Sequence, residues 1–274
     1  MPIDVRHAVA PDQLPQFTTA DLRDRFVVGD LFAEGECRFC YSMADRLVIG
    51  GVVPGGASVP LTTPDEVRSE YFCERRELGV VNVGAADGIV TTDGVEHVLA
   101  PADVLYVGRG TRQVVFAGDA RFYLVSAPAH AEHPTVKVTR DEAMPVALGS
   151  IKTSNERVIH KYIHAEGAAS CQLVLGVTFL AEGSMWNTMP AHVHERRSEI
   201  YLYFNLPDDQ RVVHLMGEPH ETRHVVLANE QAVISPPWSI HAGMGTASYA
   251  FVWAMAGENL DYGDVEQQPI VGLL

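Results

Sequence analysis

The stretch PAHVHERRSEIYLYF, residues 190–204, carries a strand pattern and a group of potential ligands within fifteen positions. His192 and His194 are separated by one residue, so in an extended segment their side chains point to the same face. Glu199 then opens a run in which successive side chains alternate between two faces. This alternation predicts a β-strand. A turn or bulge around the intervening ERRS would bring Glu199 beside the two imidazoles.

Short β-branched or alternating runs fill most of the remaining chain, and helical periodicity is scarce. Turn residues interrupt these runs about every 8–12 residues, a spacing typical of β-sandwiches and barrels. The Asp-Gly pair at residues 93–94 is a hairpin signal. Residues 18–28, with Thr18 or Thr19 as the cap, and residues 139–146 are the helix candidates. We therefore expect an all-β fold with few short helices.

The strand pattern occurs twice, which predicts two small β-barrels in one chain. The first barrel is expected over residues 46–130 and the second over residues 171–274. Residues 1–45 are interpreted as an N-terminal attachment. Residues 131–170 are polar and contain few strand-like runs, so they are interpreted as a connector.

The composition of the chain excludes several classes of partner. Of the 274 residues, 47% are hydrophobic and 20% are charged, which is typical of a globular protein. The net charge is −15 and no Lys/Arg run is present, which argues against nucleic acid or an anionic membrane as partner. An anionic small substrate remains possible, because one local Arg or Lys can bind a carboxylate.

The ends and the apolar runs of the chain indicate a cytoplasmic protein. No apolar run approaches the roughly 20 residues that a membrane helix requires. The N-terminus lacks a basic segment followed by an apolar one, so it does not resemble a secretory signal.

The four cysteines are too few and too scattered for a disulfide framework. Cys37 and Cys40 form a single C-x-x-C, whose spacing fits a redox pair or half of a zinc site. No second C-x-x-C follows, and the surrounding residues show a strand pattern. Structural thiols are therefore the favoured interpretation.

A fourth potential ligand, His241, lies in AVISPPWSIHAGMG, residues 232–245, after a strand-like run and two prolines. An H-x-H pair, then a Glu, then a later histidine on a strand is the ligand order of cupin barrels. Histidines and a carboxylate suit Zn²⁺, Fe²⁺, Mn²⁺ or Ni²⁺. An isolated H-x-H is more often a solvated pair, but here the glutamate and the later histidine would also have to be coincidences. We therefore predict a metal site formed by His192, His194, Glu199 and His241.

Two other histidines bear on the number of metal sites. His214 has apolar neighbours, and we expect it to be a core or cross-strand histidine. His97 is the one histidine of residues 71–128, and that range contains no H-x-H. The first barrel is therefore expected to bind no metal and to act as a structural or oligomerisation partner.

Long segments of both halves resemble the 5-keto-4-deoxyuronate isomerases, also named 4-deoxy-L-threo-5-hexosulose-uronate ketol-isomerases. The resemblance covers essentially the whole chain, and its segments are YFCERRELGVVNVG, DVLYVGRG, ARFYLVSAPAH, CQLVLGVTFLAEGSMWNTMPAHVHERRSEIYLYFNLP, MGEPHETRHVVLANEQAVISPPWSIHAGMGT and AMAGENLDYGD. This sequence departs from the family near Ser198, where the family usually has a methionine, but the difference does not affect a ligand position.

The resemblance implies a bicupin, that is, two jelly-roll barrels. It also implies one Zn²⁺ per subunit, held in the second barrel by His192, His194, Glu199 and His241. Members of the family are commonly hexamers, so a homo-oligomer is expected, and a homohexamer is the form that the resemblance suggests.

The implied reaction converts 5-dehydro-4-deoxy-D-glucuronate to 3-deoxy-D-glycero-2,5-hexodiulosonate in pectin and uronate breakdown. A proton moves between C1 and C2 through an enediol, which requires an electrophile, a base and a cation for the substrate carboxylate. Tyr201 and Tyr203 are candidates for the base, although aromatic residues also fill cores. Arg223 and Lys161 are candidates for the carboxylate, although each could be a surface charge.

Three alternative functions fit the same pattern. One is 5-deoxyglucuronate isomerase of inositol catabolism, which shares the reaction type and the bicupin plan. Another is an iron-dependent cupin dioxygenase, because three histidines and a glutamate also bind oxygenase iron. The third is a storage or sugar-binding cupin without catalysis. Fold alone does not decide among them.

Overall fold

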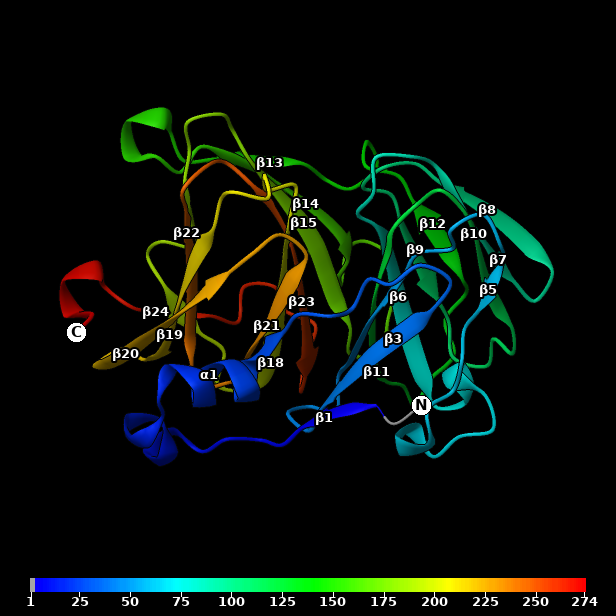
Figure 1. Ribbon diagram of the computed structural model, residues 1–274, viewed down its shortest axis with the longest axis horizontal. Helices are drawn as coiled ribbons and strands as arrows, with labels where there is room; N and C mark the ends of the chain where they lie inside the picture. The colour runs from blue at the N-terminus through cyan, green and yellow to red at the C-terminus, as the bar shows by residue number, and fades with distance from the viewer. Residues whose placement is uncertain (1–2) are drawn as a thin grey trace.

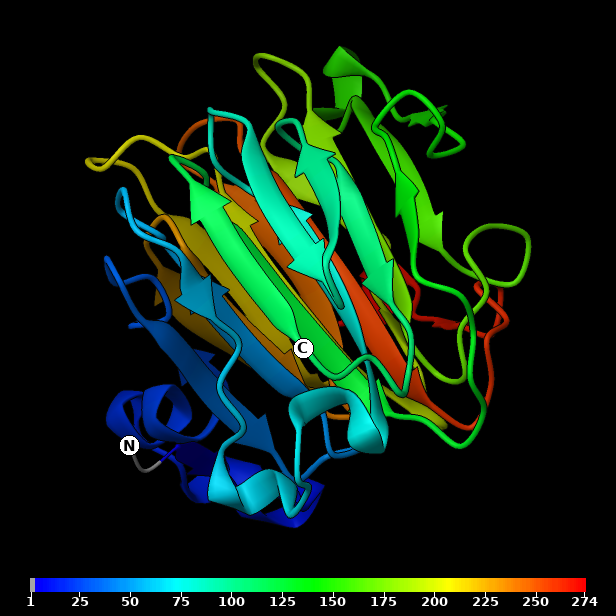
Figure 2. The same ribbon diagram turned by 90° about the vertical axis from the view of Figure 1, so that its right-hand side faces the viewer.

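The computed structural model describes residues 3–274, which form four large β-sheets packed face to face (Figures 1 and 2) and one small two-stranded sheet. Each half of the chain pairs one seven-stranded sheet with one four-stranded sheet. The two seven-stranded sheets lie in the middle of the molecule and face each other. The all-β fold with two barrels that the sequence predicts is therefore confirmed.

The first barrel combines the sheet β1-β3-β4-β11-β6-β9-β12 with the sheet β5-β10-β7-β8. Its strands are β1 (Asp4–Arg6), β3 (Cys37–Ser42), β4 (Val48–Val52), β5 (Val59–Pro60), β6 (Arg76–Asn82), β7 (Gly88–Thr92), β8 (Val95–Leu99), β9 (Val104–Val107), β10 (Val114–Gly118), β11 (Phe122–Pro128) and β12 (Val136–Val138). The Asp-Gly hairpin is confirmed, because Asp93 and Gly94 join β7 to β8 with φ angles of 47° and 85°.

The second barrel combines the sheet β13-β14-β15-β23-β18-β21-β2 with the sheet β16-β22-β19-β20. Its strands are β2 (Val27–Val28), β13 (Val146–Leu148), β14 (Arg157–Ile163), β15 (Val174–Leu180), β16 (Trp186–Asn187), β18 (Arg197–Phe204), β19 (Val212–Glu218), β20 (Glu221–Leu227), β21 (Gln231–Ser235), β22 (Ile240–Gly245) and β23 (Ala250–Gly257). A separate two-stranded sheet pairs β17 (His192–Val193) with β24 (Glu266–Gln267).

Helical structure is confined to short segments. They are the α-helix α1 (Thr19–Phe26) and the 3₁₀ turns η1 (Pro11–Gln16), η2 (Asp65–Val67), η3 (Phe72–Glu74), η4 (Ile151–Thr153) and η5 (Ile270–Gly272). No helix in residues 3–274 is long and apolar enough to span a membrane.

One helix prediction is confirmed and the other is wrong. Thr18 caps α1, its hydroxyl accepting a hydrogen bond from the Asp21 backbone N–H. Residues 139–146 form only a turn, in which Thr139 and Glu142 exchange hydrogen bonds. This reciprocal bonding resembles the start of a helix, but Pro145 follows too soon for a helix to continue.

Three apolar clusters explain why so many strands are buried on both faces. One cluster fills each barrel, and a third lies between the two seven-stranded sheets. On β18, Tyr201 and Tyr203 point into the second barrel, whereas Ile200, Leu202 and Phe204 pack between the sheets. Glu199 shares the face of Tyr201 and Tyr203, so β18 presents it to the barrel interior.

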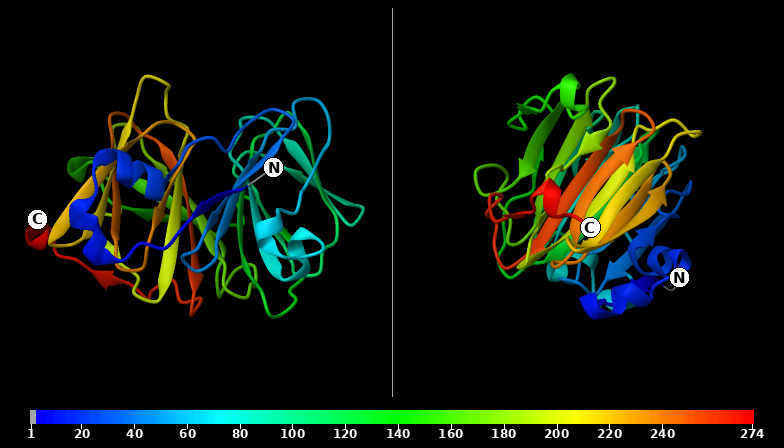
Figure 3. Two further views of the ribbon diagram at one scale, coloured as in Figure 1. Left: turned by 60° about the horizontal axis from the view of Figure 1, so that its bottom comes forward. Right: turned by 90° about the vertical axis from the view of Figure 1, so that its left-hand side faces the viewer.

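The strands extend beyond the boundaries that the sequence suggests for the two halves. Within residues 1–45, β3 belongs to the first barrel, whereas β2 pairs with β21 of the second. The N-terminal segment therefore runs along both barrels, and α1 packs against the second one (Figure 3). Within residues 131–170, β14 pairs with β15 as an internal strand of the second barrel. Its sequence RVIHKYI includes Arg157, whose side chain lines a cavity in this barrel.

Candidate metal centre and cavity

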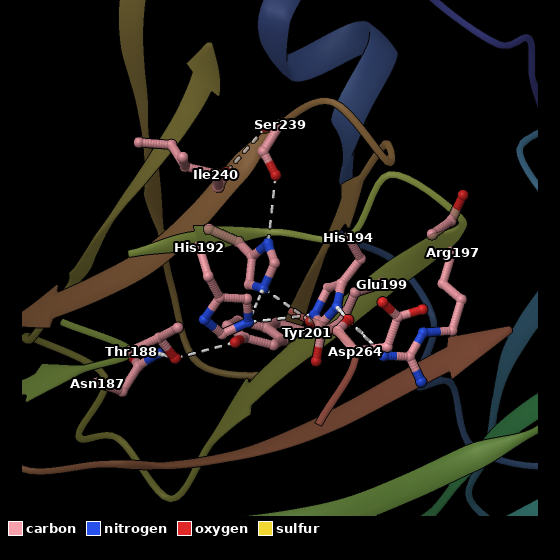
Figure 4. Close-up of polar contacts among 12 residues, drawn as sticks. Asn187, Thr188, His192, His194, Arg197, Glu199, Tyr201, Ser239, Ile240 and Asp264 are labelled. Atoms are coloured by element: carbon pink, nitrogen blue, oxygen red, sulfur yellow. Dashed lines mark hydrogen bonds and ion pairs between the residues drawn. The ribbon is translucent and has the colours of Figure 1, made fainter. Parts of the chain in front are cut away.

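Four side chains converge inside the second barrel from three strands and one loop (Figure 4). β17 carries His192, the loop after it carries His194, β18 carries Glu199 and β22 carries His241. The Nε2 atom of His192 lies 3.1 Å from Nε2 of both His194 and His241. Glu199 Oε2 lies 3.0 Å from His194 Nε2 and 2.7 Å from His241 Nε2. The four residues that the sequence singles out as ligands are therefore brought together.

The Nδ1 contacts of His194 and His241 show where the lone pairs of the Nε2 atoms point. His194 Nδ1 is 3.0 Å from the backbone oxygen of Asp264, and His241 Nδ1 is 3.3 Å from that of Ser239. A carbonyl oxygen only accepts, so both Nδ1 atoms carry the hydrogen when the rings are neutral. Both Nε2 atoms then present lone pairs to the centre of the cluster. This arrangement is usual for metal-bound histidine.

The donor atoms fit a divalent metal ion. Ligand atoms that lie about 2.0–2.2 Å from one ion are roughly 3 Å apart, as the cluster atoms are. Without a cation, acceptor atoms would face one another in a site where His194, Glu199 and His241 are at most 5% exposed. Imidazole nitrogen and carboxylate oxygen are ligands that zinc and other transition metals share.

The electrostatics of the cluster favour the forms that bind metal. Burial lowers the pKa of His192 to about 2, and the neighbouring His241 adds to this effect. Burial alone would raise the pKa of Glu199, but His241 and His194 outweigh it and hold that pKa below its usual range. A neutral imidazole and an ionised carboxylate are the states in which these groups act as ligands.

A cavity of about 310 Å³ adjoins the cluster, and His192, His194 and Glu199 form part of its wall. Such a volume is at the lower end of the range of small-molecule sites, which is roughly 300–1,000 Å³. Large apolar side chains, among them Phe251, Trp253 and Met255, make up much of the wall. The polar side chains that line the cavity besides the cluster are Arg157, Thr178, Thr188, Tyr201, Tyr262 and Gln267.

Arg157 is a cavity residue that the sequence reasoning missed. It is the one Lys or Arg side chain on the cavity wall within residues 3–274, and one Nη donates to the Asn155 backbone oxygen at 2.8 Å. Burial lowers the pKa of Arg157, but arginine stays charged at neutral pH. Its alternation with Ile159 could have placed it on an inner face, but only if residues 157–163 had been recognised as a strand.

The two cations proposed from the sequence lie elsewhere. Arg223 is on β20, where it pairs with Glu221 at 2.5 Å, and it is not part of the cavity wall. The Lys161 ammonium lies 5.3 Å from the ring centroid of Tyr262. Tyr262 lines the cavity, but Lys161 is not part of the cavity wall.

The two candidate tyrosines differ in their access to the cavity. Tyr201 lines the cavity, and its hydroxyl lies 3.0 Å from Thr188 Oγ1. Tyr203 does not line it, and its hydroxyl lies 2.8 Å from His214 Nδ1 in the barrel core. The expectation that His214 is a core histidine is confirmed, because its side chain is fully buried.

The C-x-x-C segment does not form a site. All four cysteines are free. Cys37 packs toward the interior of the first barrel, whereas Cys40 lies in the cluster between the two barrels. The two thiols therefore occupy opposite faces of β3, as residues three apart on a strand must. Burial raises their pKa values to about 11 and about 12, so both are structural thiols.

Sequence and structure comparisons agree with this architecture. The sequence model of the KduI/IolB family matches residues 30–270. A 4-deoxy-L-threo-5-hexosulose-uronate ketol-isomerase of Halalkalibacterium halodurans is 52% identical over 266 residues, covering 95% of this chain and 96% of that protein.

Two solved structures share the fold. An IolB-like protein of Salmonella typhimurium LT2 has a TM-score of 0.66 at 17% identity and covers 81% of this chain and 86% of its own. The oxalate decarboxylase of Lactobacillus farciminis has a TM-score of 0.55 at 10% identity and covers 78% of each chain. At such identities these two structures show the cupin-type fold alone.

Proposed function

Because the chain belongs to the KduI/IolB family, we propose that it is a zinc-dependent ketol-isomerase of pectin and uronate breakdown. Its substrate would be 5-dehydro-4-deoxy-D-glucuronate and its product 3-deoxy-D-glycero-2,5-hexodiulosonate. The observation that carries the proposal is a four-residue donor cluster, three of whose members line a cavity that also holds one arginine. Such a cavity can receive a carbonyl end and a carboxylate end of the same small molecule.

The resident metal would be held by His192, His194, Glu199 and His241. When bound, a divalent ion supplies Lewis-acid polarisation of the substrate oxygens on the carbons between which the proton moves. The backbone oxygens of Asp264 and Ser239 orient two of the imidazoles for this task. Loss of such supporting contacts commonly lowers metal affinity or activity by roughly 10–100-fold.

Arg157 would bind the substrate carboxylate. Its guanidinium offers paired N–H donors whose geometry matches a carboxylate, and the bond is charge-assisted. The apolar wall formed by Phe251, Trp253 and Met255 excludes water around the reacting carbons. Tyr201 is the cavity tyrosine on the same face of β18 as Glu199, so its hydroxyl is a candidate for contact with the reacting end.

The test is turnover by protein whose metal content has been measured. Zinc-loaded protein should convert the 5-keto uronate to the 2,5-diketo acid under anaerobic conditions, followed by proton NMR. Absence of turnover in protein with a filled site would contradict the proposal.

A parallel assay with 5-deoxyglucuronate distinguishes the second activity that the family name suggests. Because relatives about 52% identical are named for the first reaction, we expect a higher kcat/KM for the keto uronate. Higher efficiency with 5-deoxyglucuronate would assign the chain to inositol catabolism instead. The molar mass of the same preparation, measured by light scattering after size-exclusion chromatography, tests the proposed homohexamer.

A further inference from the structure

A chain of hydrogen bonds runs from the core of the second barrel to the cavity wall (Figure 4 shows its outer half). The Tyr249 hydroxyl lies 2.5 Å from Asn187 Oδ1, and Asn187 Nδ2 lies 2.9 Å from Thr188 Oγ1. Thr188 Oγ1 lies in turn 3.0 Å from the hydroxyl of Tyr201. Tyr249, Asn187 and Tyr201 are at most 2% exposed, so their polar atoms depend on one another for partners.

The direction of the first two hydrogen bonds follows from the buried end of this series, at Tyr249. Within residues 3–274 the Tyr249 hydroxyl has one hydrogen-bond partner, the side chain of Asn187. A buried hydroxyl needs an acceptor for its hydrogen, so the facing atom is the amide oxygen. The amide nitrogen of Asn187 therefore faces Thr188 Oγ1 and donates to it.

The outer end joins two hydroxyl groups that both line the cavity, and either one can donate to the other. Thr188 Oγ1 already accepts from Asn187, so its own hydrogen is available for its remaining partner, the oxygen of Tyr201. Across the described chain, Thr188 is also the only hydrogen-bond partner of the Tyr201 hydroxyl. With Thr188 as the donor, Tyr201 accepts at its oxygen, and its own hydrogen points into the cavity that Tyr201 lines.

The backbone at Thr188 and Gly243 positions the hydrogen-bonded side chains. Thr188 has a φ of 54°, a left-handed conformation that is unusual for a β-branched residue and marks local strain. Gly243 lies beside the chain, and a Cβ there would stand 2.3 Å from Asn187 Oδ1 and 2.8 Å from the Tyr249 hydroxyl. Only glycine leaves room for these two groups to meet.

We propose that Tyr201 is a catalytic hydrogen-bond donor, and that Tyr249, Asn187 and Thr188 are positioning residues that turn its hydrogen toward the substrate. The proposal rests on the ketol-isomerase function. The acceptor would be the substrate oxygen on which negative charge develops as the enediol forms. A donor held in advance at that position stabilises the transition state without reorganisation.

Two variants of Thr188 separate a hydroxyl effect from a packing effect. Thr188→Val keeps the shape of the side chain and removes the hydroxyl, and we expect kcat to fall about tenfold with KM within about threefold of wild type. Thr188→Ser keeps the hydroxyl and should retain nearly all of kcat. Equal kcat in wild type and Thr188→Val would overturn the proposal.

Tyr201→Phe should lower kcat roughly 100-fold or more, the loss seen when one donor to an oxyanion is removed. Because Thr188 acts through Tyr201, the double variant should be no slower than Tyr201→Phe alone. Multiplication of the two losses would contradict this dependence. Tyr203→Phe is the matched control, since it removes a buried hydroxyl of the same strand outside the cavity, and its kcat should stay within about threefold.

Asn187→Asp tests the direction of the chain. A carboxylate would accept from both Tyr249 and Thr188, so the Thr188 oxygen would then accept from Tyr201 and draw its hydrogen away from the cavity. We expect kcat to approach that of Tyr201→Phe although the tyrosine is present, and an unchanged kcat would contradict the proposed direction. If this variant fails to fold, the Thr188 pair still decides.

Neutron diffraction from crystals of the deuterated wild-type protein keeps this inference separate from the proposed function. We expect a deuteron on Thr188 Oγ1 directed at Tyr201, and a second one on Tyr201 directed into the cavity. A deuteron on Tyr201 directed at Thr188 would overturn the inference even if the enzyme turned over the keto uronate. Absence of turnover together with the expected deuterons would instead reject the function and leave the hydrogen-bond direction intact.

Discussion

Arg157 would orient the proposed acidic substrate, since it is the one Lys or Arg side chain on the cavity wall within residues 3–274. Replacing it by methionine removes a charge-assisted hydrogen bond worth about 1.5–3 kcal/mol. We expect Arg157→Met to raise KM roughly 10–100-fold while kcat changes much less.

Arg223→Met is the matched control for this variant. It also removes an arginine from a strand of the second barrel, but that arginine pairs with Glu221 outside the cavity. Steady-state kinetics should give a wild-type KM for Arg223→Met. An unchanged KM in Arg157→Met would show that the substrate carboxylate is bound elsewhere.

His214 makes the stability of the barrel depend on pH. Burial, with a contribution from His241, lowers the pKa of His214 to about 3. In the unfolded chain that pKa is about 6.5, so below pH 6.5 the unfolded state binds a proton that the folded state rejects. His214 therefore costs stability as the pH falls from about 6.5 toward 3, and costs none above that range.

The measurement is the free energy of unfolding at several pH values for wild type and His214→Asn. Between pH 6 and 4 the wild-type value should fall more steeply, by up to about 1.4 kcal/mol per pH unit. Parallel curves for the two proteins would contradict the assignment.

The cluster residues could be predicted from sequence because His192, His194 and Glu199 are closely spaced and His241 follows on a later strand in the order typical of cupin barrels. Arg157 could not be predicted, because the sequence RVIHKYI reads as a polar connector until its pairing with β15 is known. The bond between Thr188 and Tyr201 also escapes sequence reasoning, since it depends on a left-handed backbone at a threonine.

At the scale of elements, the alternation of side chains along β3 prevents a disulfide between Cys37 and Cys40. β3 directs Cys37 into the first barrel and Cys40 toward the second barrel. A disulfide would require both thiols to approach on one side of the strand. Treatment of the folded protein with a mild oxidant should therefore produce no Cys37–Cys40 disulfide. Digestion without reductant and mass spectrometry would detect that disulfide if the strand assignment were wrong.

Two elements were predicted wrongly because the local sequence does not show how the segment continues or pairs. The Thr139–Glu142 pair has the spacing of a helix start, but the chain turns there and enters β13. β14 was not predicted because Arg157, His160 and Lys161 interrupt its apolar pattern, although the segment pairs with β15. Both cases reflect tertiary context that a single segment does not contain.

At the scale of the molecule, the two barrels share a core and are joined by buried polar contacts. Glu77 of β6 is fully buried, and its carboxylate accepts from the Tyr106 hydroxyl and from the backbone N–H groups of Cys171, Gln172 and Leu173. These three backbone groups lie just before β15, an internal strand of the second barrel's seven-stranded sheet. Glu77 therefore connects the two barrels through buried hydrogen bonds.

Glu77→Ala should destabilise the whole chain, because it leaves several buried donors without an acceptor, each costing about 1–3 kcal/mol. We expect the unfolding free energy to fall by about 3 kcal/mol or more. Both barrels should still unfold in one transition, since the apolar cluster between them is shared. Calorimetry checks both points, and two separate transitions in wild type would contradict a shared core.

The central claim is that His192, His194, Glu199 and His241 hold the metal on which isomerisation depends. Metal content and keto-uronate turnover, measured on one preparation of wild type, Glu199→Gln and the surface control His224→Gln, test it most directly. We predict about one ion per chain and turnover in wild type and in the control, with both lost or strongly reduced in Glu199→Gln. Full metal content and full turnover in Glu199→Gln would contradict the account.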